Sequence, residues 1–259
     1  MSTPALSTPA EAPKTVIVTG GARGIGYAFC EHLAGLGHRI VIADREGAEA
    51  AAARLVEQGL RAFGLRVDVV SETDAAAMVH AAEQAFGGVD ALVNNAGLFT
   101  SLALQPFEKI DNAEWMQVME VNTLGVFNCA KAASAALRRS GRGRLVNIAS
   151  IVPMKGPPNM AHYVASKGAV IALTRSLARE MSRDKVTVNA IAPGFTLSDG
   201  VMATGLHERI GDNARTLGRC LQRDQVPADL VGALAFLISD GASFVTGQTL
   251  AVDGGGVFL

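Results

Sequence analysis

The residues best suited to chemistry are Tyr163 and Lys167, which lie four positions apart in an Ala-rich segment of helical period. Residues at this spacing share one face of a helix, so the ammonium group of Lys167 can approach the phenol of Tyr163. An unperturbed tyrosine titrates at about 10, and lowering that pKa by about three units requires roughly 4 kcal/mol of selective stabilisation of the anion. A nearby cation in a partly dry site can supply much of this energy, so we expect Lys167 to lower the pKa of Tyr163.

A serine at the end of an apolar segment completes the candidate site. Ser150 follows residues 145–149 and precedes Tyr163 by 13 positions. Its hydroxyl could hydrogen-bond a substrate oxygen while Tyr163 exchanges a proton with it. A Tyr and a Lys at this spacing also occur where Tyr covers an apolar seam and Lys is solvated. The context of the pair therefore decides between the two interpretations.

That context is an alternation of seven apolar, β-branched segments with six helical ones. The expected strands are residues 15–19, 40–43, 62–67, 91–93, 145–148, 186–191 and 249–252, and the expected helices are residues 25–36, 46–58, 72–86, 112–137, 160–182 and 227–239. Near-continuously apolar strands separated by helices indicate a parallel sheet buried on both faces. The sequence predicts an α/β fold of the Rossmann type, a doubly wound seven-stranded parallel sheet between two helical layers.

Composition limits the classes of partner. The chain has 259 residues and a formal net charge of −1, so we expect a single domain over residues 14–259 and a small-molecule substrate rather than nucleic acid or a membrane. Residues 1–13, rich in Ser, Thr, Pro and Ala, are expected to form a disordered tail. Three scattered cysteines suggest no disulfide framework and no metal site, which favours a reducing, cytoplasmic location.

Residues 195–226 are the least regular part of the chain, where Gly, Asp and Met interrupt any long period. Long connections inside a compact domain are usually functional or mobile. We expect a substrate lid with short helical pieces here, and a variable surface excursion is the alternative.

A glycine-rich turn, residues 19–26, connects the first expected strand to the first expected helix. Glycines permit a tight turn, close approach of the backbone to a pyrophosphate, and close packing of helix on strand. The helix N-terminus adds free N–H donors and a positive dipole end. The turn predicts a dinucleotide site with contacts from Gly20, Arg23, Gly24, Ile25 and Gly26.

Asp44 ends the second expected strand, 18 residues after Gly26. A carboxylate at this point can accept hydrogen bonds from both ribose hydroxyls of NAD and would repel the 2′-phosphate of NADP. We therefore expect NAD as the cofactor. Arg23 and Arg45 could each reach a 2′-phosphate, so NADP remains the alternative.

These motifs, taken in order, resemble those of the short-chain dehydrogenase/reductase family over nearly all of the chain from about Lys14. Further matches are Asp68, the Asn-Asn-Ala-Gly run at residues 94–97, Asn122 and the Pro-Gly pair at residues 193–194. The resemblance implies an oxidoreductase that forms a homotetramer through the fourth and fifth expected helices and the last strand.

The family resemblance also implies a role for each matching residue. Tyr163 is expected to be the general acid/base, and Ser150 to orient the substrate oxygen. Lys167 is expected to bind the nicotinamide ribose and lower the pKa of Tyr163, while Asn122 holds a water that links Lys167 to solvent. Besides Tyr163 and Lys167, the implied cofactor contacts are Asp68 and Val69 at the adenine, Asn95, Ala96 and Gly97 at the ribose, and Pro193, Gly194, Thr196 and Ser198 at the nicotinamide side.

The loops expected around the substrate, residues 98–99, 152–160 and 195–206, are largely apolar and contain no cluster of Arg or Lys. They favour a hydrophobic secondary alcohol or ketone, and the C-terminal segments are similar to those of bacterial phenylethanol-type dehydrogenases. The alternatives are an NADPH-dependent 3-oxoacyl thioester reductase and a non-catalytic dinucleotide-sensing protein. His162 is expected at the pocket wall or the surface, and Trp115 in packing.

Overall fold

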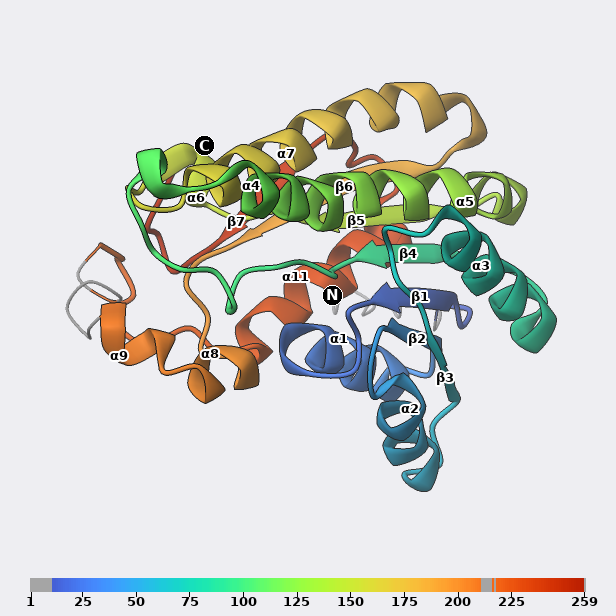
Figure 1. Cartoon of the computed structure of the whole chain (residues 1–259). Coiled ribbons are helices and arrows are strands. Elements are labelled where there is room, and N and C mark those ends of the chain that lie inside the picture. Colours follow the sequence, from blue (N-terminus) through green and yellow to red (C-terminus); the bar gives the residue numbers. More distant parts are fainter. Residues whose placement is uncertain (1–10, 211–215, 217, 259) are drawn as a thin grey trace, which may run out of the picture.

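The structure, a computed structural model, describes residues 11–210, 216 and 218–258, so most of the expected N-terminal tail lies outside the described residues. Its strands form one parallel sheet in the order β3-β2-β1-β4-β5-β6-β7 (Figure 1). The strands are β1 (Thr15–Thr19), β2 (Arg39–Asp44), β3 (Ala62–Arg66), β4 (Ala91–Asn94), β5 (Arg144–Ile148), β6 (Thr187–Pro193) and β7 (Thr249–Val252). The predicted seven-stranded Rossmann-type sheet is confirmed.

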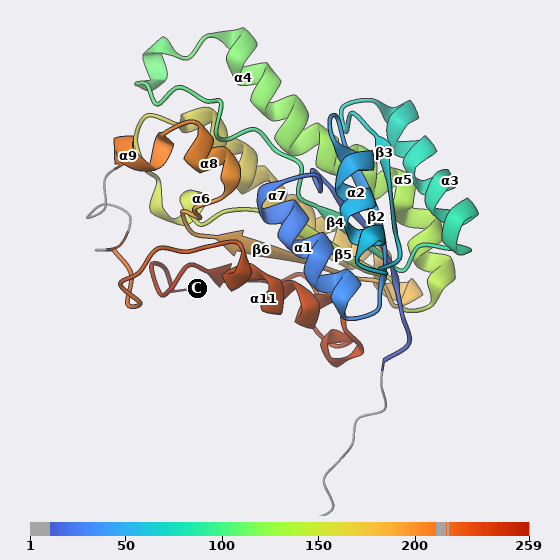
Figure 2. The same ribbon diagram turned by 90° about the horizontal axis from the view of Figure 1, so that it is seen from below.

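Helices cover both faces of the sheet because alternate strand residues point to opposite sides. Val16 and Val18 of β1 pack toward one core, whereas Ile17 packs toward the other. The first core lies under α1 (Gly24–Gly35), α2 (Ala48–Glu57) and α11 (Ala228–Ile238). Helices α1 and α11 face the viewer in Figure 2. The second lies under α3 (Glu72–Phe86), α5 (Gly125–Ser140) and α7 (Ala161–Met181).

The carboxyl ends of the strands gather the loops that carry the predicted site residues. In Figure 1, β1 and β4 both point toward the side of the molecule that holds the short helices α8 (Asp199–Ala203) and α9 (Leu206–Ile210). The sheet order reverses between β1 and β4, and ligands of such sheets bind at this switch point. A parallel bridge between Thr196 and Gln225 joins the two ends of the expected lid, of which residues 211–215 and 217 lie outside the described chain.

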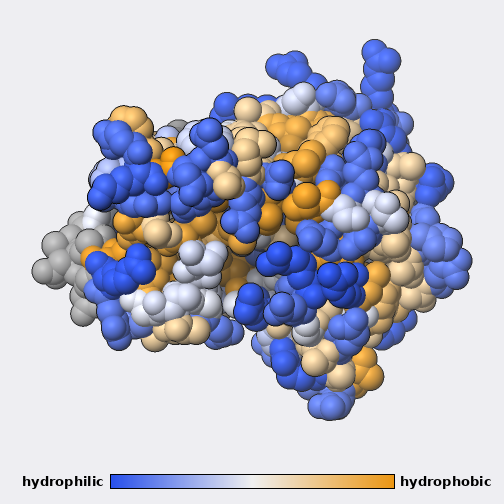
Figure 3. Space-filling view, in the orientation of Figure 1, coloured by the Kyte–Doolittle hydropathy of each residue, from blue (hydrophilic) through white to orange (hydrophobic). Residues whose placement is uncertain are grey.

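The predicted single helix at residues 112–137 differs from the observed one. The structure has α4 (Asn112–Met119), a π-helical turn η2 (Glu120–Leu124) and then α5. A π turn adds a residue to the helical repeat and is frequent at functional sites. Here it contains Asn122, whose side chain is fully buried. Several large apolar side chains nearby remain exposed, and Figure 3 shows apolar surface over this helical layer.

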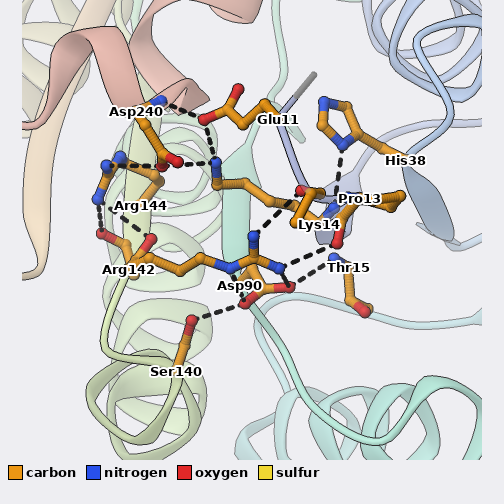
Figure 4. A network of polar contacts seen from close by, with 12 residues as sticks. Glu11, Pro13, Lys14, Thr15, His38, Asp90, Ser140, Arg142, Arg144 and Asp240 are labelled. Carbon is orange, nitrogen blue, oxygen red and sulfur yellow. Dashed lines mark hydrogen bonds and ion pairs between the residues drawn. The ribbon is translucent and has the colours of Figure 1, made fainter. Parts of the chain in front are cut away.

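At the opposite, amino-terminal edge of the sheet, Asp90 is the centre of a polar network (Figure 4). Its carboxylate accepts hydrogen bonds from the Thr15 N–H at 2.8 Å, from Ser140 Oγ at 2.6 Å and from Arg142 Nε at 3.1 Å. Burial alone would raise the pKa of Asp90, but these hydrogen bonds and the guanidinium charge hold that pKa below its usual value.

Lys14 fixes the start of the domain to the same edge. Its side chain is fully buried, and Nζ lies 2.6 Å from Glu11 Oε1 and 2.9 Å from Asp240 Oδ1. The Lys14 N–H also donates to His38 Nδ1 at 3.0 Å. Described residues just before β1 are therefore bound to the loop after α11.

We predict that Asp90→Asn lowers the free energy of unfolding at neutral pH by about 1–3 kcal/mol, because an amide cannot accept all of these hydrogen bonds. A carboxyl whose folded pKa is depressed stabilises the protein above its unfolded pKa of about 4 and loses that contribution as pH falls through the folded value. Denaturant titrations of both proteins should therefore differ at neutral pH and converge in acid. A constant difference down to the lowest pH would contradict this account.

Candidate active site

The residues predicted to be catalytic lie together at the end of β5 and on α7. Lys167 Nζ donates a hydrogen bond to the carbonyl oxygen of Ile148 at 2.8 Å. Tyr163 lies one turn earlier on α7, and Ser150 follows β5 by two residues. Tyr163, Ser150 and Lys167 are 8%, 7% and 4% exposed, so they form a nearly dry cluster.

Asn122 joins this cluster to the loop after β4. Its Oδ1 accepts a hydrogen bond from the Leu98 N–H at 2.7 Å, and its Nδ2 donates to Leu98 O at 3.1 Å and Ser166 Oγ at 3.2 Å. A Cβ at Gly97 would lie 3.2 Å from Asn122 Oδ1 and 3.5 Å from Lys167 Nζ, so a larger residue would crowd the Asn122 amide and touch Lys167. The side chain of Asn122 therefore positions the loop, and its part in a water relay stays a prediction.

The electrostatics of Tyr163 differ from the sequence prediction. Burial raises the pKa of Tyr163, and a hydrogen bond with Ser150 opposes that change without reversing it. Lys167 Nζ is directed at Ile148 O and lies 5.9 Å from the centre of the Tyr163 ring. Burial also lowers the pKa of Lys167 to about 8. The expected lowering of the phenol pKa by Lys167 is wrong for the protein alone, because the buried phenolate loses more from desolvation than its neighbours return.

The glycine-rich turn after β1 is bonded to the loop after β4. Asn95 Nδ2 donates to Thr19 O at 3.0 Å and to Gly20 O at 2.9 Å, and Thr19 Oγ1 accepts from the N–H groups of Asn95 and Ala96. A Cβ at Gly26 would overlap the carbonyl oxygen of Gly20. Glycine at position 26 is therefore required for α1 to begin so close to β1.

The N-terminus of α1 is suited to an anion. Arg23 precedes the helix with an exposed side chain, and within the described residues α1 has neither a side-chain cap nor an acidic residue in its first turn. By contrast, Ser71 caps α3 and Asp111 caps α4, each followed by acidic residues. The backbone N–H groups and the positive helix end at Gly24 and Ile25 suit a pyrophosphate, although the Gly24 N–H already has a carboxylate near it. A long contact of 3.4 Å joins the Gly24 N–H to Asp199 of the lid.

Asp44 lies beside this turn at the end of β2. Its Oδ2 accepts a hydrogen bond from the Ala22 N–H at 3.1 Å, which fixes the carboxylate at the mouth of the turn. This position suits the recognition of ribose hydroxyls. The sequence did not indicate the neighbouring Arg54, whose guanidinium lies 4.4 Å from the centre of the Tyr27 ring and donates to Ala22 O.

Asp68 and Val69 follow β3 in a loop held by an internal amide. Asn128 of α5 is 2% exposed, and its Nδ2 donates to the carbonyl oxygens of Val69 and Val70 at 3.2 and 3.0 Å. Asp68 Oδ1 accepts from the Val70 N–H at 3.1 Å. Asn128 was missed in the sequence, where its only signal is a polar residue on the apolar face of a helix.

The remaining predicted cofactor residues follow β6. The Ile151 N–H donates to Pro193 O at 3.1 Å, which joins this strand end to the loop of Ser150. Thr196 is 5% exposed, and its Oγ1 donates to Gly194 O at 3.0 Å. A Cβ at Gly24 would lie 3.4 Å from Ser198 Cβ. Residues 193–198 therefore lie between the catalytic cluster and the glycine-rich turn.

Apolar side chains surround Tyr163. The Phe99 ring centre lies 4.9 Å from that of Tyr163, and Phe195 lies 6.3 Å from Phe99. Leu102 and Val118 are buried against the same phenol. The cluster is apolar and partly aromatic, as the sequence predicted for the substrate loops.

His162 and Trp115 have contrasting environments. His162 is fully buried, with Nε2 3.1 Å from Glu114 Oε1, so the surface position that was one expectation for it is wrong. Trp115 is 37% exposed near the start of α4. Within the described residues, no group of three His, Cys, Asp or Glu side chains is arranged to hold a metal ion. No helix among them has both the length and the apolar character that a membrane crossing needs.

We predict that Tyr163 in the free protein ionises only above the ordinary pKa of about 10. The chain contains two tyrosines, so Tyr163 is the only phenol in a Tyr27→Phe variant. Near-ultraviolet absorbance of this variant at about pH 10 should show far less phenolate folded than in denaturant. Half-ionisation of the folded protein near neutral pH would contradict the assignment of burial as the dominant effect.

Comparison with known proteins agrees with this geometry. Residues 14–209 match the family model described as short chain dehydrogenase. The chain is 36% identical to a 3-oxoacyl-[acyl-carrier-protein] reductase of Staphylococcus aureus over 93% of its own length and 97% of that protein. It is 40% identical to cis-4-hydroxycyclohexanecarboxylate dehydrogenase of Sinomonas cyclohexanicum, with 94% and 96% covered.

A third relative is 2-(S)-hydroxypropyl-CoM dehydrogenase 3 of Xanthobacter autotrophicus, with 37% identity over 93% of this chain and 96% of that protein. These relatives differ in the substrates that they are named for, yet each covers nearly the whole chain. The match to the family model and the extent of these similarities identify the family and its fold. The chain belongs to the short-chain dehydrogenase/reductase family of oxidoreductases.

Proposed function

We propose that this oxidoreductase interconverts a hydrophobic secondary alcohol and its ketone, with NAD as the cofactor. The observation that supports this proposal best is the nearly dry cluster of Ser150, Tyr163 and Lys167, next to both an apolar wall and an uncapped helix N-terminus. Proton exchange, binding of an apolar substrate and binding of a dinucleotide each require one of these three features.

The proposed reaction follows from which side chains can exchange a proton and which can hydrogen-bond the substrate oxygen. Tyr163 takes the hydroxyl proton of the alcohol during oxidation and returns it to the ketone oxygen during reduction, while Ser150 hydrogen-bonds the same oxygen. When bound, the dinucleotide would accept or return the hydride, and its oxidised ring would add positive charge. Lys167, with a pKa lowered to about 8 by burial, can exchange a proton near neutral pH. Asn122 fixes the adjoining loop to α7.

The residues proposed to hold the dinucleotide come from five strand ends. Gly20, Arg23, Gly24, Ile25 and Gly26 belong to the turn after β1, and Asp44 belongs to β2. The other proposed contacts are Asp68, Val69, Asn95, Ala96, Gly97, Pro193, Gly194, Thr196 and Ser198, besides Tyr163 and Lys167. Asp44 favours NAD because its charge would oppose a 2′-phosphate at the mouth of the turn.

The apolar wall supports a hydrophobic substrate. Phe99 and Phe195 present ring faces and edges near Tyr163, and aromatic rings favour flat or alicyclic partners through area burial. One relative is named for an alicyclic alcohol, the 4-hydroxycyclohexanecarboxylate dehydrogenase. A ring-bearing secondary alcohol is therefore the substrate class that we propose.

A second candidate function is the reduction of 3-oxoacyl thioesters with NADPH. The S. aureus relative is named for such a reaction. Two exposed arginines could serve NADP: Arg45 directly follows Asp44, and Arg23 follows Ala22, whose N–H donates to Asp44. Rates measured with NADH and NADPH on an acyl thioester and on an aryl ketone separate the two candidates.

Assembly and location are also proposals. Trp115, Met116, Leu124 and Phe127 expose 37–53% of their surface on α4, η2 and α5, in the helical layer whose apolar surface appears in Figure 3. Exposed apolar side chains concentrated on one layer are typical of interfaces. We propose that copies of this chain pair through this layer in a cytoplasmic homotetramer.

We predict that Tyr163→Phe lowers kcat for alcohol oxidation by roughly 10²–10⁴-fold, because the phenol that takes the hydroxyl proton is removed. Binding of NAD, measured by calorimetry, should change by only a few-fold, since the ring remains in place. Tyr27→Phe is the matched control and should retain turnover. Turnover by Tyr163→Phe within a few-fold of the parent protein would refute the assignment.

We predict that Asp44→Ser lowers the ratio of kcat/KM for NAD to that for NADP by about tenfold or more, because the charge that opposes a 2′-phosphate is lost. Glu46→Ser, an exposed carboxylate two residues further on, should leave the ratio nearly unchanged. If Asp44→Ser leaves the NAD to NADP ratio of kcat/KM unchanged, Asp44 does not determine cofactor preference, and other residues such as Arg23 or Arg45 do.

A further inference from the structure

We propose that His162, Glu114 and Gln105 form a hydrogen-bond chain that positions the loop over Tyr163 and thereby sets the fit of the substrate. The proposal rests on the proposed function, because it concerns the same pocket. It assigns positioning roles to three residues that do not touch the reacting atoms. We call them the His162 chain.

The His162 chain crosses from the catalytic helix to α4. His162 is the second residue of α7, directly before Tyr163. Its Nε2 lies 3.1 Å from Glu114 Oε1 of α4, and Glu114 Oε2 accepts a hydrogen bond from Gln105 Nε2 at 2.7 Å. One carboxylate therefore bridges the start of the catalytic helix and the loop that precedes α4.

Burial of His162 determines which of its ring nitrogens donates to Glu114. His162 is 0% exposed, whereas the side chain of Glu114 is 24% exposed. His162 Nδ1 is buried and has no hydrogen-bond partner among the residues that the structure describes. The arrangement is best satisfied by the tautomer that carries its proton on Nε2 and donates it to Glu114. Loss of the His162 donor leaves Oε1 of the partly buried Glu114 carboxylate without that hydrogen bond, which is costly.

The same loop is attached to α7 at a second point. The Gln105 N–H donates to Asn159 O at 3.0 Å, in the turn just before α7. Asn159 adopts a left-handed conformation with a φ of 68°, which Asn tolerates better than most residues. The backbone of Gln105 thus binds the turn before α7, whereas its side chain binds Glu114 of α4.

Fixed points at both ends define the loop between them. Leu98 is held by Asn122, and Gln105 is held by Asn159 and Glu114. Between these points lie Phe99 and Leu102, which pack against Tyr163. Release of the Gln105 end would let both apolar side chains shift, and small misplacements near reacting atoms cost up to about 100-fold in rate. Apart from Tyr163 and Lys167 on α7, the predicted cofactor contacts lie on other loops or before Leu98, so NAD binding should change by no more than a few-fold.

The test compares His162→Gln, whose amide N–H can still donate toward Glu114, with His162→Leu, which cannot donate. Trp115, the only tryptophan of the chain, follows Glu114 and reports on α4 without any turnover. In His162→Leu we expect a shifted Trp115 emission and about a tenfold or greater loss of kcat/KM, larger for a bulky ketone than for a small one. His162→Gln should stay close to the parent in both measurements, and both variants should bind NAD like the parent.

His80→Leu is the control, because that exposed histidine bonds to Gln84 at 3.1 Å on α3, which is neither part of the loop nor of α4 or α7. It should change neither readout. An unchanged Trp115 emission and substrate ratio in His162→Leu would overturn the proposal, as would equal impairment of His162→Gln. If His162→Leu does not fold, Gln105→Ala decides, because it removes the amide donor to Glu114 and should produce the same shift in substrate ratio.

Failure of the proposed function would look different. A parent protein without turnover on any alcohol or ketone would refute that function, whereas the Trp115 emission of His162→Leu against His162→Gln would still decide whether the His162 chain positions α4. Turnover by the parent together with unaffected variants would refute the His162 chain alone.

Discussion

The hydrogen bond from Lys167 to the carbonyl oxygen of Ile148 is the interaction on which the site depends. It joins a buried ammonium group of α7 to the last residue of β5 across 2.8 Å. Because it fixes how α7 lies on the sheet, it also fixes Tyr163, one turn earlier, beside the serine that follows β5. Burial of this lysine lowers its pKa to about 8, so its ammonium group can exchange a proton near neutral pH.

The two edges of the sheet use polar groups in opposite ways. At the amino-terminal edge, Asp90 accepts hydrogen bonds from Thr15 and Ser140, and Lys14 forms ion pairs with Glu11 and Asp240. These contacts stabilise the fold. At the carboxyl edge, α1 begins without a side-chain cap among the described residues, although α3 and α4 have one. Helices α2, α7 and α11 also lack a side-chain cap, so the binding of an anion at the start of α1 is our proposal from its place after the glycine-rich turn.

The sequence predicted the features that local pattern determines. Apolar segments and their period located the seven strands, and glycine spacing located the turn at Gly26. Features that depend on tertiary burial were not predictable in the same way. The π turn at Asn122 adds one residue to a helix without altering its apolar pattern. The pKa of Tyr163 depends on how dry the finished cluster is, and the partner of His162 comes from a helix 48 residues earlier.

We propose that this cluster moves a proton while a hydride passes directly between the substrate carbon and the nicotinamide. The most direct measurement is the oxidation of a ring-bearing secondary alcohol that carries deuterium on its carbinol carbon, followed by mass spectrometry of the reduced dinucleotide. The account predicts that one deuterium appears in the nicotinamide ring and that none is lost to water. Deuterium recovered in the solvent, with an unlabelled dinucleotide, would contradict it.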